Sequence, residues 1–132
     1  MKPSLEDYLF LCRVVGVDKS HELSNALRIS ILRQTVNWQA VVLLASAYLL
    51  TPALYSALKA RSLLEFIDSD LSECLDELHR LNVDRNLDLK EQAIEIIAVL
   101  NKQGIVPILL KGGVSLFEDI FKKQIYFFSV GN

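Results

Sequence analysis

The residues best suited to chemistry in this sequence are Lys111, Gly112 and Gly113, which follow a short apolar run at positions 105–110. Two consecutive glycines let backbone N–H groups approach a phosphate closely, and a lysine beside them can supply the countercharge. The sequence therefore predicts a phosphate-binding turn at 111–113. The same three residues also make an ordinary strand-to-helix turn, and that purely structural interpretation stays open here.

Other residue types that do chemistry are sparse. The two histidines, His21 and His79, are far apart in sequence and have no serine or cysteine partner pattern, so we expect both to be exposed and neither to be catalytic. Cys12 and Cys74 are isolated on apolar helical positions, which is typical of core thiols in a reducing compartment. The sequence thus predicts no catalytic residue and no metal site.

The elements around the turn form a small β unit. Five of the six residues at 105–110 are aliphatic, which predicts a buried strand, although Pro107 favours an edge or a bulge. A short helix follows at 114–121, and a second apolar stretch at 125–130 predicts another strand. The relative orientation of the two strands stays open, because the connection is marginal for a parallel crossover.

Helical periodicity dominates everything before this unit. Caps and apolar stripes predict helices at 4–16, 18–36, 38–49 and 51–61, and a longer pattern over 70–103. Unbroken, the last helix would be about 50 Å long. Asparagines and aspartates at alternate positions 82–88 favour a kink or break in its middle.

These elements together predict a mainly α-helical protein: four to five helices, one of them long, followed by a strand at 105–110, a short helix and a strand at 125–130. We expect a helical domain at 1–103 and a strand–turn–helix–strand unit at 104–132, packed as one compact unit.

Composition excludes several classes of protein. The 132 residues carry 14 basic and 16 acidic side chains, a net charge of −2, so no basic field recruits nucleic acid. The longest apolar run, at 40–50, is far shorter than the roughly 20 residues of a membrane span. We expect a cytoplasmic protein without a membrane segment.

Two stretches carry a resemblance to known proteins. The first is Asn37-Trp38 opening a helix, Ala45 and Tyr48 within it, and Thr51-Pro52 starting the next; the second is the Asn86 region and Gly104-Ile105-Val106-Pro107 leading to Leu109-Leu110-Lys111-Gly112. With these residues the chain resembles a group of bacterial nucleotidyltransferase-like proteins of the polymerase-beta-type superfamily. The resemblance covers about 30–118, and its sharpest element is the strand with Lys-Gly.

The resemblance implies a metal-dependent reaction on a nucleotide. In that superfamily the glycine turn holds the triphosphate, and a following strand carries two acidic residues that bind Mg²⁺. Lys111, Gly112 and Gly113 match the turn. The acidic pair has no match, because no Asp or Glu follows Asp119, and Glu118 and Asp119 are adjacent and point in different directions.

The resemblance therefore implies a truncated or degenerate nucleotidyltransferase-like protein without independent catalysis, with weak nucleotide or phosphate binding at 111–113. We expect no cofactor for the chain as given, since Mg²⁺ and a nucleoside triphosphate belong only to the intact family. One alternative is a helical protein–protein interaction module, and another is an active enzyme of which this sequence is an incomplete version.

A last expectation concerns partners. The apolar stretch at 125–130 would invite pairing if it formed an open strand edge. We therefore expect a homo-oligomer, a dimer through this strand or through the long helix. A different protein as partner is the open alternative.

Overall fold

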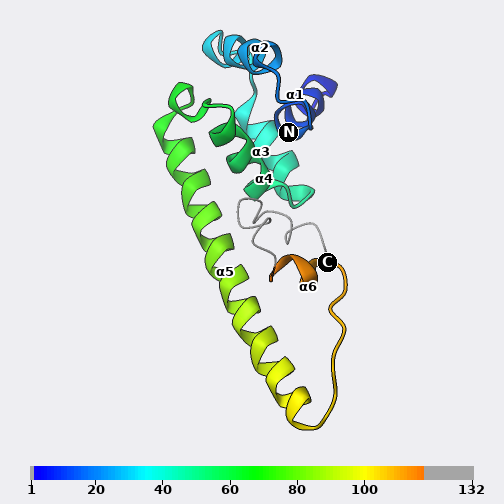
Figure 1. Ribbon diagram of the computed structural model, residues 1–132. Helices are drawn as coiled ribbons and strands as arrows, with labels where there is room; N and C mark the ends of the chain where they lie inside the picture. The colour runs from blue at the N-terminus through cyan, green and yellow to red at the C-terminus, as the bar shows by residue number, and fades with distance from the viewer. Residues whose placement is uncertain (1, 118–132) are drawn as a thin grey trace.

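The computed structural model describes residues 2–117, and all of the regular structure in this part of the chain is helical. The helices are α1 (Leu5–Val15), α2 (His21–Leu32), α3 (Trp38–Ala47), α4 (Thr51–Ala60), the 3₁₀ helix η1 (Leu64–Phe66), α5 (Ser69–Lys102) and α6 (Gly112–Ser115). The predicted mainly α-helical class is confirmed. Helices α1–α4 cluster at one end, α5 runs away from them, and the chain then returns to α6 beside the middle of α5 (Figure 1).

Short-range capping sets most of the helix ends. Ser4 and Asp7 form a capping box at the start of α1, and Asn37 caps α3. At the C-terminal end of α5, Gly104 has a φ of 75°, and the N–H of Ile105 donates to the carbonyl of Leu100 at 3.0 Å. This is a Schellman-type ending, which favours glycine because the conformation is left-handed.

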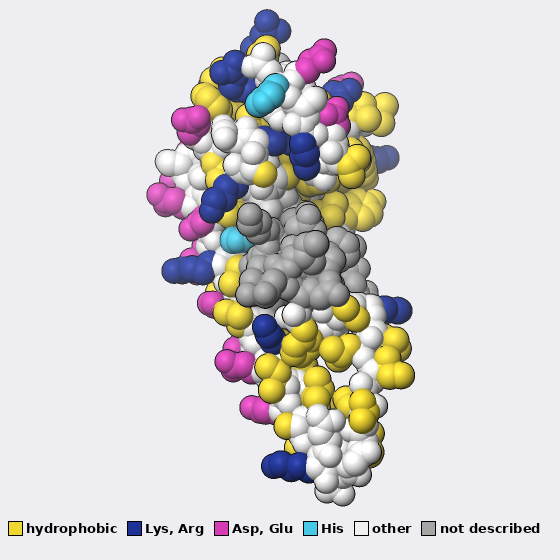
Figure 2. Space-filling model, viewed as in Figure 1, with side chains coloured by type: hydrophobic (Ala, Val, Ile, Leu, Met, Phe, Trp, Pro, Cys, Tyr) yellow, Lys and Arg dark blue, Asp and Glu magenta, His cyan; other side chains and the backbone are white. Residues whose placement is uncertain are grey.

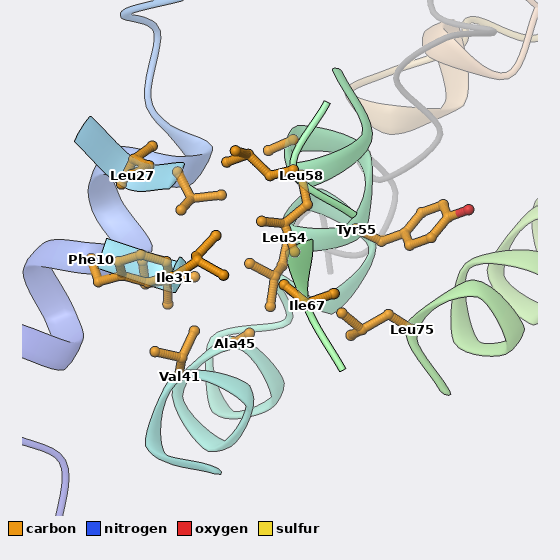
Figure 3. Close-up of a cluster of buried hydrophobic side chains, with 14 of the residues drawn as sticks. Phe10, Leu27, Ile31, Val41, Ala45, Leu54, Tyr55, Leu58, Ile67 and Leu75 are labelled. Carbon is orange, nitrogen blue, oxygen red and sulfur yellow. The ribbon is translucent and has the colours of Figure 1, made fainter. Parts of the chain in front are cut away.

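The core lies between the first four helices and the start of α5. Leu54 and Leu58 of α4 are completely buried, and α4 packs against α1, α3 and α5 (Figure 3). Although α3 is apolar along most of its length, it leaves Leu43 half exposed, and α4 occupies the centre of the core. The prediction that Cys12 and Cys74 are core thiols is also wrong, because both residues are exposed.

A buried arginine ties the bundle together. Arg61, directly after α4, is 8% exposed, and its guanidinium donates to the carbonyls of Val14, Arg13 and Asp18 and to the hydroxyl of Ser24. The distances are 3.0 Å to Val14, Arg13 and Ser24 and 2.6 Å to Asp18. One positive charge thus satisfies carbonyls at the C-terminal end of α1, where the helix dipole favours a cation.

Helix α5 continues without a break for 34 residues, so the predicted kink is wrong. The penalty for asparagine or aspartate in a helix is only about 0.7 kcal/mol per residue, which tertiary contacts can override. The last large side chain of α5 in the buried core is Leu75, and the rest of the helix extends beyond the bundle.

The chain after α5 is extended rather than helical. Residues 105–110 have no regular secondary structure, so the strand expected there is not formed within the described part of the chain. Most of helix 114–121 and all of strand 125–130 fall outside the described residues. The β unit and the division into 1–103 and 104–132 remain predictions.

Candidate functional site

The predicted turn at 111–113 adopts a well-defined geometry. The N–H of Gly113 donates to the carbonyl of Leu110 at 3.1 Å, closing a four-residue turn with Lys111 at its second position. Lys111 has φ 52° and ψ −130°, which are the angles of that position in a type II′ turn. Glycine normally occupies it, because only glycine adopts this conformation without steric cost.

The lysine is therefore held in a backbone conformation that it does not favour. Such a residue costs on the order of 1–3 kcal/mol and persists only where the surrounding structure imposes it. Its side chain is exposed at the start of α6. Strained backbone of this kind is concentrated at ligand-binding and catalytic positions, which makes Lys111 a functional candidate on geometric grounds.

Crowding within the turn does not explain the glycine at position 113. A Cβ added at Gly113 would meet the Leu109 side chain at 3.8 Å, an ordinary van der Waals contact. The chain itself thus does not require glycine at this position. Close approach of a ligand to the backbone remains a reason for it.

Helix α6 brings the turn to the middle of α5. The ammonium of Lys90 lies 5.8 Å from the centre of the Phe117 ring, a cation–π distance. Phe117 follows the Lys111–Gly113 turn by only a few residues, and Figure 1 shows α6 beside α5 at this level. The half-buried Lys90 therefore contacts the chain just after α6, the helix that starts at the turn.

A row of polar side chains on α5 was missed by sequence reasoning. His79, Asn82, Asn86 and Lys90 recur at intervals of three to four residues, the spacing of one helix face. His79 and Lys90 are half-buried, and Asn82 and Asn86 are 9% and 8% exposed. We read these asparagines as helix breakers. Their spacing from His79 is the signal that could have identified a shared face.

His79 begins this row and packs against α4. Its ring lies 4.7 Å from that of Tyr55 at an angle of 32°. Burial lowers the pKa of His79 from 6.5, and the ammonium of Lys59 lowers it further, while Asp76 opposes both. The Nδ1 atom of His79 is buried without a hydrogen-bond partner among the described groups. The prediction of an exposed His79 is wrong, whereas His21 is exposed as expected.

Tyr55 links the two helices at the same point. Its hydroxyl donates to Oδ1 of Asp76 at 2.6 Å, and this hydrogen bond, with burial and the carboxylate charge, raises the pKa of Tyr55 to about 12. Asp76 therefore bonds Tyr55 across the helix junction. Arg80, on the same helix, pairs with Glu77.

A surface cavity lies elsewhere. It has a volume of about 470 Å³ between α2, the end of α4 and η1, and Arg28, Arg61 and Phe66 line it. Arg28 is already stacked over Phe66 at 5.9 Å, and four donor contacts of Arg61 are directed to protein oxygens. This cavity contains none of the predicted site residues.

Comparison with protein families gives a match. A family model described as "Uncharacterised nucleotidyltransferase" matches residues 34–122. The chain belongs to this family. The matched range includes α3–α6, the polar row and the Lys111–Gly113 turn, so the nucleotidyltransferase-like resemblance is confirmed at the family level. No curated protein and no solved structure gave a match.

Two further properties of this family member follow from the described residues. Between residues 2 and 117, no helix is both long and apolar enough to cross a membrane. In the same range, no group of three or more histidine, cysteine, aspartate or glutamate side chains is placed to hold a metal ion. Glu118 and Asp119 lie outside it.

Proposed function

We propose that this member of the uncharacterised nucleotidyltransferase family binds the phosphates of a nucleotide at Lys111, Gly112 and Gly113 and does not transfer a nucleotidyl group by itself. Membership of the polymerase-beta-type superfamily is part of the proposal. The observation that supports it most is the type II′ geometry of the turn, with a lysine where glycine is normal.

The charge distribution supports anion binding at this turn. Lys111 is exposed, Lys90 contacts Phe117 just after α6, and glycine backbone leaves phosphate oxygens room to approach N–H groups. A flexible ammonium acts as a point charge toward phosphate. These contacts would suffice for weak binding, which is the strength that we expect.

The proposal that the chain alone transfers no nucleotidyl group rests on its acidic side chains. Two-metal chemistry needs paired acidic side chains to hold Mg²⁺ against the phosphates. In this sequence no Asp or Glu follows Asp119, and adjacent Glu118 and Asp119 cannot both face one ion from a regular element. These 132 residues therefore do not supply the paired carboxylates that nucleotidyl transfer needs.

Calorimetric titration of the full chain with ATP in MgCl₂ tests the proposal. We expect weak binding by the wild type and at least a several-fold loss in Lys111→Ala, since hydrogen bonds to a charged group contribute about 1.5–3 kcal/mol. Lys102→Ala, which removes an exposed lysine at the end of α5, is the matched control and should bind as the wild type does.

A second variant separates the effect of the Lys111 charge from the effect of its backbone conformation. Lys111→Gly also removes the charge but relieves the unfavourable φ, so it should lose binding while gaining about 1 kcal/mol of stability, after the entropy cost of glycine. Equal ATP affinity in the wild type, Lys111→Ala and Lys111→Gly would contradict the proposal. Labelled nucleotide transfer by the chain alone would contradict its second half.

A protein–protein interaction module is the second candidate function. Large apolar side chains of distal α5 and of the extended segment 105–110 face solvent, among them Ile96, Val99, Val106 and Ile108. Exposed apolar surface on this scale marks interaction sites in folded proteins. Binding of a protein without any nucleotide binding would favour this candidate.

A further inference from the structure

A second apolar stripe runs along α5, outside the face that packs on the bundle. Its members recur with the three-to-four spacing of one helix face and are Leu78, Leu81, Leu89, Ile96 and Val99. Each of these side chains is between 36% and 61% exposed. Arg85 and Gln92 occupy the two remaining positions of the stripe. At a rise of about 1.5 Å per residue the stripe is about 30 Å long, enough to lie against a partner helix of about 20 residues.

The regular spacing of the stripe sets it apart from ordinary surface leucines. Single exposed apolar side chains are normal on a folded protein. An apolar line along a helix, however, is usually the face that packs against another element. In α5 that packing belongs to a different line, which begins with the buried Leu75 and includes the half-buried Ile97 and Leu100. The stripe is therefore an apolar helix face that the described part of the chain leaves open.

An acidic row lies directly beside the stripe. Successive residues of a helix are rotated by about 100°, so the row is set about a quarter-turn from the stripe. Its members are exposed and are Glu73, Glu77, Arg80, Asp84, Asp88, Glu91 and Glu95. The row thus holds six of the 16 acidic side chains of the sequence. Figure 2 shows acidic side chains along the left edge of α5.

Most of the charge of this row is not compensated. Its single cation, Arg80, pairs with Glu77. Among the described residues no ion pair is formed by Asp84, Asp88 or Glu91. Like charges three or four residues apart on a helix repel one another and destabilise it. A positively charged partner would relieve this repulsion on binding.

We propose that the outer face of α5, consisting of the apolar stripe and the acidic row, binds a basic amphipathic helix of another protein. The stripe receives the apolar side chains of that helix, as in other complexes in which an amphipathic helix docks on an apolar surface. The acidic row pairs with lysines or arginines along one side of it, which sets orientation and partner choice. This inference does not depend on nucleotide binding at the Lys111 turn.

A second copy of this chain offers the acidic row no positive charge. Antiparallel α5 helices packed along the stripe would bring the two acidic rows together. Parallel helices would set each row against the uncharged line on the other side of the partner's stripe, which includes Leu75, Asn82 and Ala93. Past Glu95 the row continues with Lys102, so charge does not oppose a contact between two copies that is limited to this end of the helix.

Fluorescence anisotropy with three labelled peptides of about 20 residues, each titrated with the full chain, tests the proposal. One peptide contains leucines every three to four residues and lysines elsewhere, the second scrambles the same composition, and the third replaces the lysines by glutamates. The wild type should bind the first at least about tenfold more tightly than either of the others. Raising NaCl from about 50 mM to about 300 mM should weaken this binding several-fold.

A pair of double variants assigns the binding to the stripe. Leu81→Gln/Ile96→Gln should weaken binding of the leucine–lysine peptide about tenfold or more, because two apolar contacts are lost. Leu87→Gln/Ile94→Gln changes two exposed apolar residues on another face of α5 and should bind as the wild type does. Glutamine has nearly the same helix propensity as leucine, and circular dichroism verifies the helix content of both variants.

A second pair assigns the charge to the acidic row. Asp88→Asn/Glu95→Gln should weaken binding of the leucine–lysine peptide and reduce its dependence on salt. Glu6→Gln/Glu65→Gln removes the same charge from exposed positions of the helical bundle and should retain the affinity of the wild type.

Several results would overturn the inference. One is a wild type that does not bind the leucine–lysine peptide, or that binds it no better than the scrambled peptide, since charge alone would then explain the affinity. Equal affinity of Leu81→Gln/Ile96→Gln and its control on the other face would exclude the stripe. Equal binding of the leucine–glutamate peptide would show that the partner is not basic.

Discussion

At the scale of single residues, Arg61 shows how one side chain can hold several elements together. Its guanidinium replaces the missing donors for carbonyls of Arg13 and Val14 at the end of α1 and reaches Asp18 and Ser24 at the start of α2. A lysine in its place offers only one nitrogen for four acceptors. Nothing in the local sequence around Arg61 indicates these partners, because all of them lie far away along the chain.

Arg61→Ala should lower the free energy of unfolding by about 3 kcal/mol, because it leaves buried carbonyls without donors. Urea unfolding followed by circular dichroism measures this loss. Arg33→Ala, at the exposed end of α2, is the matched control and should change stability by less than about 0.5 kcal/mol. Similar stabilities of the two variants would show that the buried hydrogen bonds contribute little.

His79 gives the molecule a pH dependence with a definite sign. Because its folded pKa lies below 6.5, the unfolded state binds the proton more tightly, and stability falls as pH drops below about 6.5. Lys59 and Tyr55 on α4 and Asp76 on α5 surround the ring. The junction between α4 and α5 should therefore be weakest in acid.

Thermal melts at pH 5 and pH 7.5 measure this effect. The difference in Tm between the wild type and His79→Gln should shift in favour of the variant at pH 5, because glutamine does not titrate. His21→Gln changes an exposed histidine on α2 and serves as the control for general acid effects. The same Tm difference at both pH values would exclude His79 as the titrating group.

At the scale of elements, local signals were reliable and long-range ones were not. The Ser4–Asp7 box and the Gly104 ending were predictable because each uses neighbours within a few residues. The Lys111–Gly113 turn was located in the same way. The polar row was not recognised, since asparagine has the same low helix propensity whether it breaks a helix or lies buried within one.

The continuity of α5 has a consequence for the site. One rigid helix carries both the contact with α4 at His79 and the contact with α6 at Lys90. Sites on regular elements are positioned more precisely than sites on loops alone. Whether residues 82–88 form a helix or a break depends on packing that only the folded chain shows. Only a continuous helix places His79, Asn82, Asn86 and Lys90 on one face.

At the scale of the whole molecule, the distribution of apolar surface is uneven. Helices α1–α4 share one buried core, whereas yellow side chains are spread over much of the lower part of the surface, around distal α5 and the segment that follows it (Figure 2). In that segment Val106 is 85% exposed, Ile108 84% and Leu110 73%. Together with Ile96 and Val99 of α5 they define the distal apolar surface.

The distal apolar surface should drive self-association, because burying each large apolar side chain contributes about 1.5–3 kcal/mol. Sedimentation velocity of the full chain across roughly 1–100 μM, which spans ordinary protein–protein affinities, should show a concentration-dependent dimer. The double variant Val106→Glu/Ile108→Glu should shift the species toward monomer. Leu5→Glu, on an exposed leucine of α1 away from this surface, should leave the dimer unchanged. A wild type that stays monomeric over the whole range would mean that the surface is left for a different protein, whereas equal association in all three proteins would place the interface elsewhere.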